Sequence, residues 1–110
     1  MDDLRVEKVL RAVECIPRGK LATYGDIGAI TGESPRVVGN LLARWGSNVA
    51  WWRVCNAKGE IPGHFNEALP HWREENISLN PAGTGAQLKS HRIELEELEV
   101  HWKKATADLT

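Results

Sequence analysis

Residues 23–45 have the sequence TYGDIGAITGESPRVVGNLLARW, which predicts two helices separated by a tight glycine turn. Thr23 and Asp26 have the Ser/Thr-x-x-acid spacing that caps the start of a short helix. A second helix over about residues 35–45 is favoured by Ser34 as its N-cap, by the proline that follows and by apolar residues at helical spacing. This arrangement is typical of a helix-turn-helix, in which the second helix approaches DNA, although two packed helices would give the same pattern.

The segments on either side of this pair predict another helix and a small hairpin. Apolar residues at helical spacing over residues 3–15 indicate an amphipathic helix. Residues 49–55 are rich in β-branched and aromatic side chains and predict a strand, residues 56–59 predict a turn, and Glu60-Ile61 would begin the returning strand. We therefore expect a small winged helix-turn-helix DNA-binding domain, of the α/β class but mainly helical.

The C-terminal half carries weaker signals. Residues 66–76 predict a short helix with Pro70 in its first turn, because a proline lacks the amide hydrogen that a helix interior needs. Residues 81–85 predict a loop. The tail over residues 87–102 has apolar side chains that either a helix or a strand could bury, and its glutamates are expected to form a solvated face rather than a binding site.

Composition limits the classes of protein to which these elements can belong. With 110 residues, 42% hydrophobic and 26% charged, the chain has a globular balance and room for one domain over residues 1–110. Apolar runs fall short of about eighteen residues and the start of the chain is acidic, so we expect a cytoplasmic protein, nucleoid-associated when bound to DNA or nuclear in a eukaryote, with no membrane partner. Cys15, Cys55 and the four histidines lack zinc-site spacing, so no metal and no other cofactor is expected.

Charge is distributed unevenly along the chain. The net charge is -1, yet residues 1–60 hold nine Lys and Arg against seven Asp and Glu, whereas residues 61–110 hold five against eight. The first half, which contains the two central helices, therefore permits a local basic face for nucleic acid without requiring one.

Three motifs follow one another along the chain: Lys20-Leu-Ala-Thr-Tyr-Gly-Asp-Ile, Pro35-Arg36-Val-Val-Gly39 and Ala50-Trp51-Trp52-Arg53-Val54. Together they resemble the DNA-binding domain of the O6-alkylguanine-DNA alkyltransferase family over about residues 3–102. In the enzymes of this family the third motif is Pro-Cys-His-Arg-Val, and its cysteine accepts the alkyl group. Here Trp51 has the place of the cysteine, which resembles the alkyltransferase-like relatives that bind alkylated DNA without repairing it themselves.

The chemistry of the third motif favours recognition over repair. Alkyl transfer is a displacement that needs a thiolate, and an indole has no comparable nucleophile at neutral pH. Trp52 also replaces the histidine that would serve as base in the enzymes. Cys55 is a nearby thiol, but along a strand it would lie about 13 Å from Trp51. We expect no enzymatic activity, with residual transfer to Cys55 as an alternative.

The resemblance implies a lesion pocket and a DNA-binding surface. Aromatic walls suit a flipped alkylated base, and the pocket residues are predicted to be Tyr24, Trp51, Trp52 and Val54. The predicted DNA contacts are Tyr24, Ser34, Arg36, Gly39 and Lys58, with Arg44 as a further candidate for phosphate. Arg36 corresponds to the wedge that takes the place of the flipped nucleotide in the stack. Arg53 is expected to have an internal, structural role.

Two alternatives remain open at this point. Adjacent strand residues point to opposite faces, so one of the two tryptophans could be a core residue. The domain could also be a sequence-specific winged-helix regulator that reads base edges in the major groove. The favoured hypothesis is a monomer that binds duplex DNA containing O6-alkylguanine, flips the base into a Trp-lined pocket and, by the family resemblance, marks it for nucleotide excision repair proteins.

Overall fold

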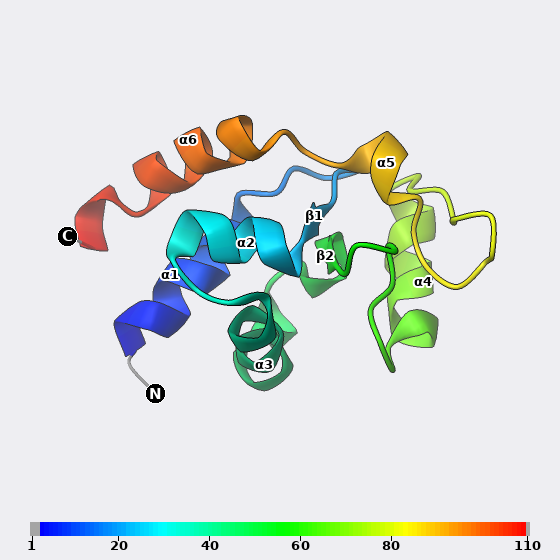
Figure 1. Cartoon of the computed structure of the whole chain (residues 1–110), viewed down its shortest axis with the longest axis horizontal. Coiled ribbons are helices and arrows are strands. Elements are labelled where there is room, and N and C mark those ends of the chain that lie inside the picture. Colours follow the sequence, from blue (N-terminus) through cyan, green and yellow to red (C-terminus); the bar gives the residue numbers. More distant parts are fainter. Residues whose placement is uncertain (1–2, 110) are drawn as a thin grey trace.

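The computed structural model describes residues 3–109, which form mainly helices around a very short parallel sheet (Figure 1). In chain order the elements are α1 (Asp3–Glu14), β1 (Ala22–Thr23), α2 (Tyr24–Thr31), α3 (Pro35–Trp45), the 3-10 turns η1 (Gly46–Asn48) and η2 (Trp51–Arg53), β2 (Val54–Cys55), α4 (Phe65–Glu74), α5 (Leu88–His91), α6 (Leu95–Ala105) and the 3-10 turn η3 (Ala107–Leu109). The predicted class, a mainly helical small domain, is confirmed. Within the described range, no helix combines the length and apolar character needed to cross a membrane.

The predicted helix-turn-helix is present as α2 and α3, and local capping defines both helices. The Thr23 hydroxyl accepts a hydrogen bond from the Asp26 amide at 2.9 Å, and the Asp26 carboxylate accepts one from the Thr23 amide at 3.0 Å. Gly32 ends α2 in the left-handed conformation, with a φ of 80°. Ser34 then caps α3, because its Oγ accepts from the Val37 amide at 3.1 Å.

Two apolar clusters fill the interior, and the short sheet lies between them. The first is enclosed by α1, α2, α3 and α6, and its fully buried members include Val9, Val13, Ile27, Val38, Leu41 and Leu98. The second lies against α4 and includes Leu21, Cys55, Ala68 and Trp72. Ala22 pairs with Val54 in parallel register and both belong to the first cluster, whereas Cys55 belongs to the second. Figure 1 shows the corresponding division, with α4 and α5 on one side of the strands and the other helices opposite.

The expected strand over residues 49–55 and its hairpin are corrected by the structure. Only Val54–Cys55 is a strand, and it pairs in parallel with β1 rather than with Glu60-Ile61. The amide of Asn56 donates to the carbonyl of Glu60 at 2.8 Å and closes a turn in place of the hairpin. The composition of the segment favoured a strand, but its tryptophans pack against α4 and η2 forms instead, so tertiary contacts outweigh β-propensity.

Helix α4 also differs from its prediction. Pro70 lies in the helix interior and not in the first turn. Its missing amide hydrogen removes the helical hydrogen bond to the carbonyl of Asn66, a residue on the exposed side of the helix. The C-terminal tail forms a helix rather than a strand: Leu98 of α6 is fully buried, and the indole of Trp102 donates to the carbonyl of Lys8 at 2.9 Å.

Substitutions of Gly28 and Gly39 test how tightly the helix-turn-helix is packed. A Cβ at Gly28 would collide with the backbone carbonyl of Glu33, whereas a Cβ at Gly39 would meet nothing within 4 Å. We expect Gly28→Ala to lower the free energy of unfolding by about 1–3 kcal/mol through overpacking. Gly39→Ala, the matched control, should be neutral or should stabilise by up to about 1 kcal/mol through helix propensity. Urea unfolding measures both, and equal stability of the two variants would contradict the close packing at Gly28.

Candidate nucleic-acid interface

An apolar cavity of about 530 Å³ opens between α3, η2 and the start of α4. Its walls include Tyr24 from the start of α2, Gly39 and Leu42 from α3, Trp51 from η2, and His64 and Glu67 from the beginning of α4. Cavities that hold small ligands have volumes of about 300–1,000 Å³ and mostly apolar walls. Three residues predicted from the sequence, Tyr24, Gly39 and Trp51, therefore meet at a hollow large enough for a ligand.

Trp51 is held in this wall by aromatic neighbours that meet it edge to face. Its ring centroid lies 5.9 Å from that of Trp52, 5.9 Å from that of His71 and 6.1 Å from that of His64. Edge-to-face contacts of this kind are favourable because the positive ring edge meets the negative ring face. The side chain is half-buried, so one part of the indole is fixed by the protein and another lines the cavity.

Trp52 and Val54 do not line the cavity, which corrects their predicted role in the pocket. Trp52 stacks on His71 with 3.7 Å between ring centroids, and its backbone carbonyl accepts from the indole of Trp72 at 2.8 Å. Val54 is fully buried in the first cluster. The 3-10 turn accounts for the arrangement of the tryptophans: successive residues are about 120° apart there, so they do not alternate between opposite faces as in a strand.

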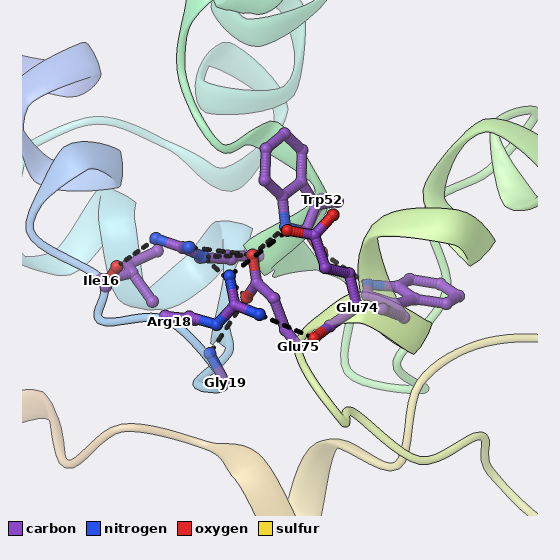
Figure 2. A network of polar contacts seen from close by, with 8 residues as sticks. Ile16, Arg18, Gly19, Trp52, Glu74 and Glu75 are labelled. Atoms are coloured by element: carbon purple, nitrogen blue, oxygen red, sulfur yellow. Dashed lines mark hydrogen bonds and ion pairs between the residues drawn. The ribbon is translucent and has the colours of Figure 1, made fainter.

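The carboxylate of Glu75, at the end of α4, fixes the position of η2 (Figure 2). It accepts hydrogen bonds from Trp52 Nε1 at 2.8 Å, from Arg53 Nη2 at 2.8 Å and Nε at 2.9 Å, and from the Gly19 amide at 3.0 Å. Arg53 Nη1 also donates to the carbonyl of Ile16 at 2.8 Å. These contacts, which we call the Glu75 network, therefore join three segments that are distant in sequence. Arg53 lies within this network.

Charge in the network is stabilised by hydrogen bonding. Burial alone would raise the pKa of Glu75, but the hydrogen bonds from Arg53, Gly19 and Trp52 outweigh it and hold the pKa below its usual value. The carboxylate is only 4% exposed and pairs with Arg53 at 2.8 Å. Glu75 therefore remains ionised at neutral pH as the acceptor for all its donors.

Tyr24 is positioned by the cap of α2. The neighbouring Asp26 accepts from Arg92 Nη2 at 2.7 Å and Nε at 3.1 Å, which ties the start of α2 to the segment before α6. Burial raises the pKa of Tyr24, so its hydroxyl stays protonated at neutral pH and can donate a hydrogen bond at the cavity wall.

The other predicted DNA contacts are distributed over the surface. Ser34 and Arg36 are exposed at the N-terminus of α3, where the helix dipole is positive. Arg44 lies at the other end of α3, with its guanidinium 5.7 Å from the ring centroid of Trp45. Lys58 lines a different hollow, beside Arg92, and does not reach the Trp51 cavity. Among the predicted contacts, Gly39 of α3 lines the cavity, Ser34, Arg36 and Arg44 lie towards the ends of the same helix, and Lys58 lies apart from them.

Cys55 is unsuited to nucleophilic chemistry. Its side chain is fully buried in β2, and burial raises the pKa of the thiol to about 12. A thiol of this kind is protonated at neutral pH, whereas the reactive species is the thiolate.

His64 and Glu67 were not among the residues predicted for the site. His64 Nδ1 and a carboxylate oxygen of Glu67 lie 2.9 Å apart at the cavity wall. Their spacing of three residues places both on one helical face, which is a signal visible in the sequence. This spacing indicates a binding site only when the structure shows that α4 begins at the cavity.

Comparison with known proteins assigns the chain to a family. Residues 5–98 match the family described as "6-O-methylguanine DNA methyltransferase, DNA binding domain", and the chain therefore belongs to this family. Two relatives are each named "DNA base-flipping protein". The protein of Escherichia coli (strain K12) is 40% identical over 65 residues, covering 54% of this chain and 50% of the relative. The protein of Vibrio parahaemolyticus serotype O3:K6 (strain AQ3810) is 37% identical over 65 residues, covering 56% and 64%.

A solved structure is similar over most of the chain. It is the crystal structure of S. pombe Atl1 in complex with damaged DNA containing O6-carboxymethylguanine, with a TM-score of 0.72 and 26% sequence identity. The match covers 86% of this chain and 98% of that chain. By contrast, the chain matches only about half the length of the E. coli relative.

Stability against acid should report on the Glu75 network. Because its pKa is lowered in the folded state, Glu75 stabilises the fold above its unfolded pKa of about 4.3, and this contribution is lost as pH falls through the folded value. Glu75→Gln should lower the free energy of unfolding by about 3 kcal/mol at pH 7, because it leaves Arg53 without its charged partner. The difference from the parent should begin to shrink as pH falls below the unfolded pKa of about 4.3, and should vanish only below the lowered folded pKa, where Glu75 is protonated as well.

Glu74→Gln is the matched control, since the Glu74 side chain is 70% exposed. It should change stability by less than about 0.5 kcal/mol. Urea unfolding at a series of pH values measures both variants. A Glu75→Gln protein with parental stability at pH 7 would contradict the structural importance of the network.

Proposed function

We propose that the protein binds duplex DNA containing O6-alkylguanine, rotates the damaged base into the cavity beside Trp51 and holds it there without removing the alkyl group. The observation that carries the proposal is the apolar cavity walled by an indole at the position that resembles the acceptor site of the enzymes. An indole can stack on a flat base, and the apolar walls can shelter an added alkyl group. The names of the base-flipping relatives and the Atl1 complex with damaged DNA support this assignment.

The helix α3 is well suited to approach DNA from the side of the cavity. Gly39 lines the cavity and leaves space above the helix backbone, and Arg36 is exposed in the first turn of the same helix. A long side chain with a planar guanidinium can occupy the gap that a flipped nucleotide leaves in the stack. The positive end of the α3 dipole lies beside Arg36 and favours the negative charge of a phosphate.

The same site lacks the means for alkyl transfer. Trp51 offers no thiolate, and the buried, protonated Cys55 lies in the strand below rather than in the cavity wall. We therefore propose a binding protein and not an enzyme. We extend the proposal to a cytoplasmic monomer whose stable complex marks the lesion for nucleotide excision repair proteins.

Substitution of each tryptophan tests the proposal. In titrations at one fixed salt concentration, the parent should bind a duplex with O6-methylguanine more tightly than the matched guanine duplex. Trp51→Ala should keep its fold and lose about 1–3 kcal/mol of this preference, the range for stacking on a base. Trp52→Ala, the comparison variant, should instead lower the melting temperature, because Trp52 packs on His71 and bonds to Glu75.

Results of these titrations that differ from the expected ones identify which part of the proposed function is wrong. Equal affinity for the two duplexes would contradict lesion recognition and favour a sequence-specific regulator. If Trp51→Ala is unfolded and Trp52→Ala is stable, Trp51 is the residue that supports the fold and Trp52 is the residue that recognises the lesion. Mass spectrometry of protein recovered from the lesion complex should find no methyl adduct, and an adduct on Cys55 would overturn the non-enzymatic proposal.

Arg36→Ala should weaken binding to the O6-methylguanine duplex by about 1–3 kcal/mol, as expected for loss of a stacking or bidentate DNA contact. Lys103→Ala removes the same charge from the exposed surface of α6 and serves as the control. Fluorescence anisotropy measures both. If the two variants lose affinity equally, Arg36 contributes only general surface charge.

A further inference from the structure

The cavity has an asymmetric charge distribution. Among the described residues that line it, Glu67 supplies the carboxylate, His64 supplies an imidazole beside it, and no lysine or arginine contributes. Tyr24 stays protonated because burial raises its pKa. A ligand that enters the cavity therefore meets one acidic side chain without a permanent cation to balance it.

Glu67 is well placed to remain negative. It is the third residue of α4, within the first turn, where the helix dipole favours an anion. The hydrogen bond from His64 is the main cause that lowers the pKa of Glu67. The side chains of Glu67 and His64 are 57% and 55% exposed, so the pair lies where the cavity opens to solvent.

We propose that Glu67 makes the cavity selective for neutral O6-alkyl groups and disfavours adducts that carry a negative charge. This inference rests on the proposed function, since it concerns the ligand of the same cavity. An O6-alkyl group projects from the flipped base into the cavity, and a carboxylate at its end would approach the Glu67 carboxylate. The apolar walls around Trp51 and Leu42 limit screening on one side of the two charges, whereas solvent at the half-exposed Glu67 screens the other side, so the repulsion is modest.

Two adducts of nearly the same shape separate charge from size. O6-carboxymethylguanine carries a carboxylate, and O6-carbamoylmethylguanine carries a neutral amide in its place. The carboxymethyl adduct is the one present in the damaged DNA of the Atl1 complex. A difference in affinity between the two duplexes therefore measures the response of this cavity to charge.

The experiment titrates the parent protein and Glu67→Gln with three matched duplexes, which contain guanine, the carboxymethyl adduct or the carbamoylmethyl adduct. The parent should bind the carboxymethyl duplex about two- to fivefold more weakly than the carbamoylmethyl duplex, and Glu67→Gln should bring this ratio close to one. Glutamine preserves the size of the side chain. Glu97→Gln removes the same charge from the exposed first turn of α6, and its ratio should equal that of the parent.

The outcomes separate this inference from the proposed function. Preference for both adducts over guanine with a parental ratio near one would leave the proposed function standing and overturn the role of Glu67. A large ratio that persists in Glu67→Gln, or that falls equally in Glu97→Gln, would also overturn it. If neither adduct binds more tightly than guanine in any of the proteins, the proposed function itself is wrong and the inference falls with it.

Discussion

The carboxylate of Glu75 holds together the parts of the molecule that shape the cavity. Arg53 and Trp52 of η2 donate hydrogen bonds to it, the amide of Gly19 in the loop after α1 donates another, and Glu75 itself is the C-cap residue of α4. A buried ion pair adds little net stability in many proteins, because removing both charges from water costs about as much as their attraction returns. Its value here is geometric, since the pair and its hydrogen bonds admit one arrangement of η2 and thereby one position for Trp51.

A fixed indole also changes the energetics of binding. Trp51 contacts the rings of Trp52, His64 and His71 in the free protein, and these contacts fix its rotamer before a ligand binds. Ordering a side chain at an interface typically costs about 0.5–1.5 kcal/mol, and a wall that is ordered in advance avoids that cost. The open space above Gly39 acts in the same direction, because no side chain has to move aside there. The fold therefore supplies a preformed cavity rather than one that the ligand must create.

The sequence predicted the features that depend on neighbours in the chain. Thr23 with Asp26 and Ser34 with its proline define the two central helices through contacts that span three residues, so spacing alone reveals them. The partnership of Glu75 with Arg53 spans 22 residues, and no local pattern identifies it. The parallel pairing of β2 with β1 also joins residues that are distant in sequence, and no local pattern predicts it. The pocket role assigned to Trp52 came from the family resemblance and not from the strand pattern. Tyr24 and Trp51 were placed by family resemblance, which carries information that periodicity lacks.

Under the proposed function, an indole at the place of a nucleophile has a consequence for how the protein is used over time. A cysteine acceptor is converted once into a thioether and cannot react again. Under the proposed function Trp51 forms no bond to the alkyl group, and the protein leaves each encounter chemically unchanged. The number of lesions occupied is then governed by mass action, through the concentration of the protein and its dissociation constant, and not by a stock of unreacted molecules. A small pool could survey the same DNA repeatedly, and its occupancy would fall again as lesions disappear.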